Sequence, residues 1–490
     1  MHNQTFLAGA HTDNIHMIME RIGQNFDVVL REFRIGGSGA RAAIIYISDL
    51  ADVEKVHEDV LKPLMLVGSG LSGGTGSGVE VGAVVTVGEI TEANSLEVCL
   101  DNILRGETVL IIDGRSGAFI LGTRYWESRN IEQPISETVV RGPRDGFIET
   151  LSTNISLLRR RINNPAFTMV KLRLGERTQK EVVVAYMDGI ANQKLVQTVL
   201  ARVGKINLDD VPESGFIEQF IEDNHFSPFP QVMNTERPDK VVAALMEGRV
   251  AILLDGTPFV LLAPVTFWML LQSPEDYYER WMIGTLLRML RFISTVMALF
   301  LPSIYVALTS YHQGLIPTRL AISIASSREG VPFPTLIEAL IMEATIELLR
   351  EAGIRLPKVV GQAVGIVGGL VIGQSAVQAG IVSPIMLIVV AVTAICSFTL
   401  PHYGVAISIR MLRFGMMFAA SVMGLYGIML AFLLLCAHLC KLKSFGVNYT
   451  APYVHTNWRD MKDNIIRAPL QLFKLRPRFL RPKDDLRSKS

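Results

Sequence analysis

The chain has 490 residues, of which 49% are hydrophobic, with a formal net charge of +1 and a mean hydropathy of +0.34. Its four cysteines are scattered, which excludes a disulfide framework. Charged and hydrophobic residues are distributed unevenly along the chain. Residues 1–280 carry interleaved charges of both signs, residues 281–440 are membrane-like, and residues 441–490 form a basic tail with 12 Lys/Arg against 4 Asp.

The N-terminal region reads as a soluble part of the protein. Met1 leads into polar residues, without a charged segment followed by an apolar run, so no signal peptide is predicted and this region is expected in the cytoplasm. About 280 residues exceed the usual size of one domain, so two hydrophobic cores are expected.

Three stretches of this soluble part recur in the same order. The pairs are Phe33–Gly36 with Leu172–Gly175 and Ile44–Asp49 with Val183–Asp188, both at an offset of 139, and Gly106–Gly114 with Gly248–Gly256 at an offset of 142. Each is an apolar, partly β-branched run that predicts a buried strand ending in turn residues. Helices are predicted over Val53–Leu66 and Gln193–Val203. We therefore predict two tandem duplicated α/β subdomains, 1–137 and 138–268.

The first copy contains a glycine-rich segment over residues 68–78, with a GxGxxG string. Such a string can cradle a dinucleotide, but no helix start follows it here, so a surface loop is the favoured interpretation. Asp113, Asp188 and Asp255 recur at strand ends, where turn-forming aspartates are common. No catalytic residues, no metal site and no cofactor are predicted.

The strongest membrane signal is the stretch between Lys358 and Arg410, which holds 51 residues without an Asp, Glu, Lys or Arg. A charge at the middle of a bilayer costs about 3 kcal/mol, and this stretch is long enough for two passes. Two further uncharged runs, Phe292–Tyr311 and Phe414–Ala437, flank it. The sequence therefore predicts a multi-span helical transmembrane domain.

An interfacial segment is predicted over residues 269–291, with Tyr277, Tyr278 and Trp281 suited to the headgroup layer. Its last part, which carries Arg288 and Arg291, is typical of an amphipathic helix lying at the interface. The transmembrane domain then covers residues 292–440. The predicted spans are 292–311, 359–379, 384–401 and 414–438. Four passes leave both ends in the cytoplasm, so residues 441–490 are a cytoplasmic tail.

Residues 335–352 form a further predicted helix, on which Glu343, Glu347 and Glu351 share one face. The favoured interpretation is an amphipathic helix at the interface with its charges in water. The alternative is a re-entrant helix whose carboxylates line a vestibule and attract cations.

The span 359–379 has two different faces. Glycines at successive i, i+4 steps form a smooth face that a neighbouring backbone can approach closely: Gly361, Gly365, Gly369 and Gly373. The opposite face carries Val360, Val364, Val367, Val371, Gln374 and Gln378. This second face either contacts another helix or lines a pore with an apolar constriction and a polar mouth.

Several motifs resemble one family, the A subunits of the GerA-type spore germinant receptors of endospore-forming bacteria. The matching stretches are Val140–Phe147, Ser227–Gln231, Thr235–Lys240, Ser273–Trp281, Ser310–Gly314, Val331–Pro334, Thr345–Gly353 and Gly361 onward to Gln374. Eight motifs in order make the resemblance specific, and it covers about residues 12–470. The glycine-rich segment 68–78 departs from the family pattern.

The resemblance implies a protein of the spore inner membrane that works with a permease-like B subunit, which binds the nutrient, and a lipoprotein C subunit. It also implies a homo-oligomer, a pentamer, that forms a nutrient-gated channel for monovalent cations and triggers germination. No nucleic-acid partner is expected. On this basis the span 359–379 would be the pore helix, with its valines as the gate and its glutamines as a polar ring.

Two other functions stay open from the sequence. One is a membrane-anchored receptor or scaffold that binds a small molecule in the cleft between the duplicated subdomains without conducting ions. The other is a secondary transporter, which the lack of repeats in the membrane half disfavours. An enzyme is the least favoured. The family's paralogues that amplify ion release are not distinguished from true receptors.

Overall fold

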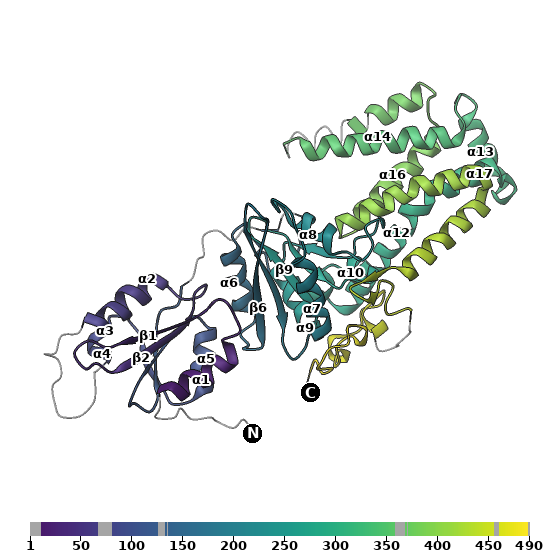
Figure 1. Ribbon diagram of the computed structural model, residues 1–490. Helices are drawn as coiled ribbons and strands as arrows, with labels where there is room; N and C mark the ends of the chain where they lie inside the picture. Colours follow the sequence, from purple (N-terminus) through teal and green to yellow (C-terminus); the bar gives the residue numbers. More distant parts are fainter. Residues whose placement is uncertain are drawn as a thin grey trace. The chain divides into compact units, whose positions relative to one another are not determined.

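The computed structural model describes residues 11–66, 81–125, 133–134, 136–357, 368–369, 371–454 and 460–488. The chain forms two compact units (Figure 1). The first consists of Met1–Glu222, Val232–Pro264 and Lys474–Ser490, and the second of Asp223–Gln231 and Val265–Phe473.

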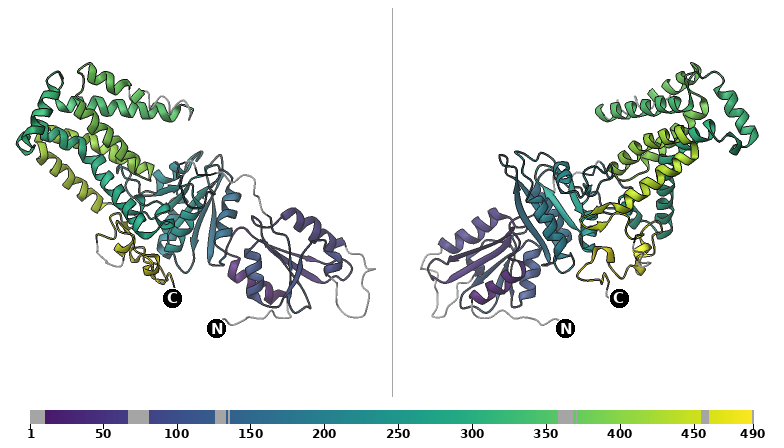
Figure 2. Two further views of the ribbon diagram at one scale, coloured as in Figure 1. Left: turned by 180° about the vertical axis from the view of Figure 1, so that it is seen from behind. Right: turned by 45° about the vertical axis from the view of Figure 1, so that its right-hand side comes forward.

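The first unit contains two five-stranded antiparallel sheets with the same strand order (Figures 1 and 2). One sheet runs β1 (Val28–Arg34), β2 (Arg41–Ile47), β4 (Thr108–Ile112), β5 (Ala118–Leu121) and β3 (Ile90–Ala93). The other runs β6 (Phe167–Leu174), β7 (Lys180–Met187), β9 (Val250–Leu254), β10 (Val260–Ala263) and β8 (Met233–Thr235). This repeated topology confirms the predicted duplication of an α/β subdomain.

Helices surround these sheets. Those of the first subdomain are α1 (His11–Ile22), α2 (Val53–Lys55), a π-helical turn (Val56–Leu61), α3 (Lys62–Leu66), α4 (Val81–Val84) and α5 (Leu96–Leu104). Those of the second are α6 (Leu151–Arg161), α7 (Gln193–Val203), α8 (Ser214–Ile221) and α9 (Pro238–Glu247), and the C-terminal segment adds a 3-10 turn (Arg478–Leu480). Both predicted helices, 53–66 and 193–203, are confirmed.

The first sheet is covered on both faces, and its central strands β2 and β4 are apolar at all but their first positions, Arg41 and Thr108. In β2, Ala43, Ile45 and Ile47 pack into one core cluster with residues of α1 and α5. Ile44 and Tyr46 pack into the opposite cluster, which includes residues of the helical stretch 53–66. Alternate residues of a strand point to opposite faces, so a strand between two helical layers reads as one continuous apolar run.

The structure corrects the register of the repeat in the second strand of each subdomain. Val28 pairs with Ile47 in the first sheet, and its counterpart Phe167 pairs with Met187 in the second. The offset is therefore 139 in the first strand but 140 in the second, and the predicted value of 139 for the second strand is wrong. The hairpin of the second copy is one residue longer. A one-residue shift exchanges the two faces of a strand, but here both faces are apolar, so the sequence pattern did not reveal it.

The second unit is mainly helical. Its elements are α10 (Phe267–Leu270), α11 (Glu275–Tyr278), α12 (Trp281–Ser310), a 3-10 turn (Gln313–Leu315), α13 (Thr318–Arg328), α14 (Thr335–Arg355), α16 (Pro384–Phe398), α17 (Tyr403–Lys441), a short ladder of β11 (Lys443–Ser444) and β12 (Val447–Asn448), and 3-10 turns at Asp460–Lys462 and Leu470–Leu472. Within the described residues, α12 and α17 are long and apolar enough to cross a membrane, and α16 is apolar but shorter.

These helices bear on the four predicted spans. The span 292–311 falls almost entirely within α12, and 384–401 overlaps α16. The span 359–379 lies partly outside the described residues, which give helix only at 368–369 and 371–378 in this stretch. The four-span arrangement as a whole therefore stays a prediction.

The fourth predicted span, 414–438, is wrong as one continuous helix. At Gly424, φ is 60° and ψ is −140°, which breaks α17 into two arms. A Cβ atom added at Gly427 would meet the carbonyl oxygen of Ala419. Eight residues along a straight helix are about 12 Å apart, so this close approach requires the chain to turn back sharply at the break (Figure 1).

Side chains of the segment after α12 contact the break in α17 and stabilise it. The Tyr311 hydroxyl donates to the carbonyl oxygen of Ser421 at 2.6 Å and lies 3.3 Å from that of Val422. The ring of His312 lies against Gly424, where it would contact an added Cβ. A helix break leaves backbone carbonyls without helical partners, and a side-chain donor can satisfy them. The Ser310–Gly314 motif thus has a structural role as the support of the α17 break.

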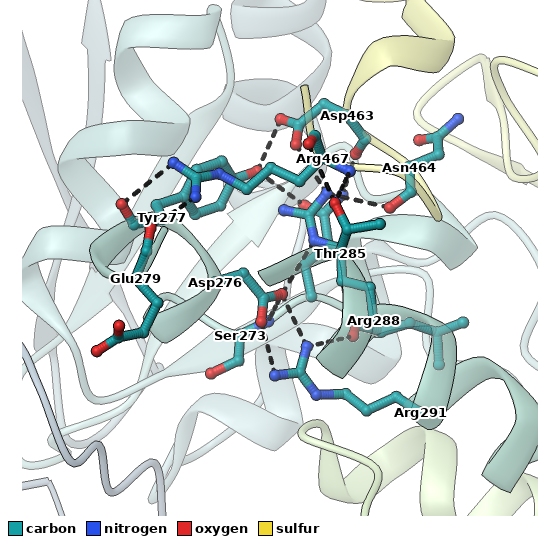
Figure 3. Close-up of polar contacts among 12 residues, drawn as sticks. Ser273, Asp276, Tyr277, Glu279, Thr285, Arg288, Arg291, Asp463, Asn464 and Arg467 are labelled. Atoms are coloured by element: carbon teal, nitrogen blue, oxygen red, sulfur yellow. Dashed lines mark hydrogen bonds and ion pairs between the residues drawn. The ribbon is translucent and has the colours of Figure 1, made fainter. Parts of the chain in front are cut away.

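The predicted amphipathic interfacial helix is also corrected. Residues from Trp281 onward are the first turns of α12, and Arg288 is only 4% exposed. Arg288 donates to Asp276 at 3.1 Å and to Asp463 at 2.8 Å, and Arg291 donates twice to Asp276 at 2.7 Å (Figure 3). The charges are neutralised inside the protein, so they do not need the water that an interfacial helix supplies.

Tyr277 takes part in the same network rather than standing free at a headgroup layer. Its hydroxyl donates to Asp463 at 2.7 Å, and the guanidinium groups of Arg288 and Arg467 lie 5.1 and 5.6 Å from its ring centroid (Figure 3). Arg467 also donates to the carbonyl oxygen of Glu279 at 2.8 Å. These contacts join the segment before α12 to the residues near position 465.

The end of the chain is folded. Arg476 donates to the carbonyl oxygen of Met246 at 2.8 Å, and Lys483 donates through its backbone N–H to the carbonyl oxygen of Ile190 at 2.9 Å. The guanidinium of Arg249 lies 5.9 Å from the ring centroid of Phe479. Residues 474–488, the last part of the predicted tail, therefore pack onto the second subdomain.

Candidate functional site

The cleft between the two subdomains of the first unit is closed at one point by a buried ion pair. Arg159 of α6 donates to both carboxylate oxygens of Asp27, at 3.0 and 2.9 Å, and the two side chains are 1% and 0% exposed. Beside it, the Asn25 side-chain oxygen accepts the backbone N–H of Met169 at 2.8 Å. A bidentate pair of this kind is directional, so it sets how the two subdomains meet.

Two adjoining cavities of about 230 and 150 Å³ lie along this cleft and share Tyr125 and Arg160. The larger is lined by Leu50, Leu104, Arg105, Arg124, Tyr125, Arg159, Arg160 and Asn163, and the smaller by Ser48, Asp49, Tyr125, Ser152, Thr153, Ser156, Leu157 and Arg160. The larger cavity is lined by arginine, asparagine and leucine side chains, and its donors Arg159, Arg105 and Arg124 are already paired with carboxylates of the protein.

Asp49 in the smaller cavity has an unusual titration. The pKa of its carboxyl is raised to about 6, mainly by burial and also by the nearby charge of Asp27, while Arg159 opposes the rise. An unfolded aspartate has a pKa of about 3.9. Because the folded pKa is the higher one, the stabilisation from this group is present below pH 4 and is lost as the pH rises through 6.

We therefore expect Asp49→Asn to raise the free energy of unfolding at pH 7 by about 2 kcal/mol and to give little gain at pH 4, as measured by chemical denaturation. Asp113→Asn, at an exposed strand end, is the matched control and should leave the pH dependence of stability unchanged. An equal gain from Asp49→Asn at both pH values would contradict the assignment.

In the second unit, the acidic face of α14 is paired with arginines. Glu343 is 1% exposed and accepts a hydrogen bond from Arg413 of α17 at 2.5 Å. Glu347 accepts from Arg350 at 2.9 Å and from Arg410 at 3.0 Å. The favoured interpretation, an interfacial helix with these charges in water, is wrong for Glu343, because α17 brings a partner charge to it.

Glu351, the third member of the predicted face, pairs with Arg355 at 2.6 Å, and both are exposed. Cation attraction by Glu343, Glu347 and Glu351 stays a prediction, but the geometry favours ion pairing between helices instead. We call Glu343, Glu347, Arg350, Arg410 and Arg413 the α14–α17 charge cluster. Arg350 extends it to α16 by donating to the Ser397 hydroxyl at 3.2 Å.

Part of the predicted pore helix lies outside the described residues: Val360, Gly361, Val364, Gly365 and Val367. Among the described positions, Gly373 is buried, and a Cβ added there would lie 3.3 Å from Leu387 of α16. Val371, Gln374 and Gln378 lie on the opposite face and are exposed in the single chain. Gly369 has nothing within 4 Å of an added Cβ.

A buried carboxylate at the start of α14 was missed from the sequence. Glu338 is fully buried and accepts hydrogen bonds from the backbone N–H and the hydroxyl of Ser383, at 2.6 and 2.5 Å, while Arg328 lies 3.5 Å away. Ser383 is the N-cap of α16, so the negative charge lies where the helix dipole favours it. A charged residue within an apolar helix was the available signal.

The remaining sequence features carry less. The glycine-rich segment 68–78 lies outside the described residues. Within the part of the chain that the structure describes, no group of three or more His, Cys, Asp or Glu side chains is arranged to hold a metal ion.

The comparisons with known proteins agree with the resemblance that the motifs indicate. The family described as Bacillus/Clostridium GerA spore germination protein matches residues 16–479. The chain is 45% identical over 467 residues to spore germination protein GerLA of Bacillus cereus, covering 95% of each chain. It is also 45% identical to the uncharacterized membrane protein YfkQ of Bacillus subtilis (strain 168), covering 92% of this chain and 87% of that one.

Among solved structures, the chain is similar to the N-terminal domain of the A subunit of the Bacillus megaterium spore germinant receptor GerK3. The identity is 32%, the TM-score is 0.43, and the match covers 54% of this chain and 98% of that one. The protein belongs to the GerA family of spore germination proteins. Its relatives are named for germination or for the membrane and not for an enzymatic reaction.

Proposed function

We propose that this protein is the A subunit of a nutrient-sensing germinant receptor of the spore inner membrane, with its N- and C-terminal parts in the cytoplasm. It oligomerises, as a pentamer, around the helix 359–379 and forms a channel for monovalent cations whose opening triggers germination. A permease-like B subunit and a lipoprotein C subunit are its partners. Family membership supports the germination role, and the two-faced helix supports the channel.

The observation that carries the channel is the division of residues 371–378 into two faces. Gly373 packs against α16, while Gln374 and Gln378 are exposed on the other face of the single chain. Glutamine side chains need hydrogen-bonding partners that lipid tails lack, so this face requires either water or another protein surface. A ring of identical chains around an aqueous axis supplies both.

The channel opens because the nutrient binds more tightly to one of its two states than to the other. A ligand shifts a two-state equilibrium only by the difference between its affinities for the two states. Moving a channel from 1% to 99% open takes about 5.5 kcal/mol. A B subunit that binds the nutrient in one state and contacts this chain can supply a difference of this size, so the A subunit needs no nutrient pocket of its own.

The test is potassium flux from liposomes that contain the purified chain, with and without its B subunit. Val367→Phe should change the flux several-fold because it alters the apolar constriction, whereas Ile388→Phe, at an exposed position on α16, should not. Cysteine at position 371 should cross-link between chains across the axis. Labelling of that cysteine by lipid-soluble reagents without any cross-link would contradict the pore assignment.

The second candidate function is a small-molecule receptor, favoured by the arginine-lined cavities between the subdomains. In this case the membrane unit anchors the protein without conducting ions. Absence of flux in every state, together with binding of a nutrient to residues 1–268, would support it over the channel.

A further inference from the structure

The α14–α17 charge cluster contains more positive than negative charge. It combines three arginines, Arg350, Arg410 and Arg413, with only two carboxylates, Glu343 and Glu347. It lies among the apolar helices α14, α16 and α17 of the second unit. An excess charge away from water is costly unless an opposite charge reaches it.

The hydrogen bonds of this cluster show the same imbalance. Among the arginines of this cluster, three buried N–H groups have no acceptor in the described part of the chain: Nε and Nη2 of Arg413 and Nε of Arg350. Arg413 is only 2% exposed, and one buried carboxylate oxygen, that of Glu343, is without a donor. A buried donor without an acceptor costs about 1–3 kcal/mol, and more when it is charged. With three unpaired donors against one unpaired acceptor, the cluster has an excess of donors and of positive charge.

Aromatic rings lie against two of the arginines, and the next carboxylate along α14 is already paired. The Arg350 guanidinium lies 4.8 Å from the ring centroid of Phe398, and that of Arg410 lies 5.7 Å from the ring centroid of Tyr403. The next acidic side chain on α14, Glu351, is committed to Arg355. The missing acceptor therefore comes from outside the described residues.

We propose that the α14–α17 charge cluster binds one small monovalent anion of the size of chloride, held by Arg413 and Arg350. The anion accepts the unpaired N–H groups and brings the net charge of the cluster to zero. Arginine N–H groups are strong donors to anions and stay charged at every physiological pH. The site fastens α14 to α17, and it is independent of whether the protein conducts ions.

The test is the thermal unfolding of the full-length chain in detergent, in chloride, bromide or gluconate at equal ionic strength. We expect chloride and bromide to raise the unfolding temperature in a saturable way, whereas gluconate, which is too large for the site, should not. Arg413→Gln should abolish the difference between the salts. Arg355→Gln, at an exposed position of α14, the helix that also carries Arg350, is the control and should keep it.

Glu343→Gln provides a second, opposite variant. It retains all three arginines and raises the net positive charge by one, so half-saturation should occur at a several-fold lower chloride concentration. If Arg413→Gln does not fold, Arg350→Gln replaces it, with the same expected loss. Equal unfolding temperatures in all three salts would mean that water or a partner chain accepts hydrogen bonds from the unpaired N–H groups. This result would overturn the proposal. An unchanged chloride response in the folded Arg413→Gln or Arg350→Gln variant would overturn it equally.

Discussion

Replacing Arg288 by methionine is expected to lower the free energy of unfolding of the second unit by about 3 kcal/mol. Methionine keeps much of the length and apolar stem of arginine, so the change removes mainly the charge and the donors. Asp463 then loses its ion-pair partner, and Asp276, which is fully buried, keeps only Arg291. Removing one member of a buried pair leaves an uncompensated charge in the protein interior.

The measurement is denaturant-induced unfolding of the full chain in detergent, with Arg280→Met as the matched control. Arg280 lies at the N-cap of the same helix but is exposed, so its replacement should change stability by less than about 0.5 kcal/mol. If both variants were equally stable, the network around Arg288 would not stabilise the second unit.

This network joins residues 175 positions apart, from Arg288 to Asp463, so its loss should also expose the segment near residue 465 to proteolysis.

The second large effect is expected at the break in α17. Gly427→Ala should destabilise the second unit by about 2–3 kcal/mol, because the new Cβ would meet the carbonyl oxygen of Ala419, and a backbone atom cannot rotate away. Gly424→Ala should act in the same direction, since φ 60° with ψ −140° is a conformation that only glycine adopts without strain.

Gly415→Ala is the matched control in the same helix. Nothing lies within 4 Å of an added Cβ at that position, so the substitution should be neutral or stabilise by up to about 1 kcal/mol through helix propensity. Thermal unfolding of the three variants in detergent distinguishes the cases. If Gly427→Ala were as stable as Gly415→Ala, then the sharp turn at Gly424 would not exist in the protein.

The elements that the sequence predicted well are those with a dense local signal. The central strands of the duplicated subdomains are almost entirely apolar, and β4 and β9 lead into Asp-Gly turns, Asp113-Gly114 and Asp255-Gly256. Both glycines adopt positive φ, 82° and 90°, as the turn chemistry requires. The edge strands β3 and β8 were missed because they are short and half polar, with too few residues for a periodic pattern.

The candidate site was predicted less well, for the same physical reason. The glutamates of α14 and the arginines of α17 were each visible in the sequence as single charges in apolar helices. Their pairing was not, because Glu343 and Arg413 are 70 residues apart. A charged side chain without a partner is expected to lie near water, whereas a paired one is not. Because the arginine partners of the α14 glutamates were not visible in the sequence, an interfacial helix or a water-filled vestibule was expected.

By itself the sequence determined the soluble and membrane-like halves, the duplication and the family, because hydrophobic periodicity, turn residues and ordered motifs are local properties of the chain. Only the tertiary structure decided the strand register, the break at Gly424 and the partners of the buried charges. Each of these depends on which distant residue comes into contact, and the free energy of that contact is set by burial and distance in space, not by separation along the chain.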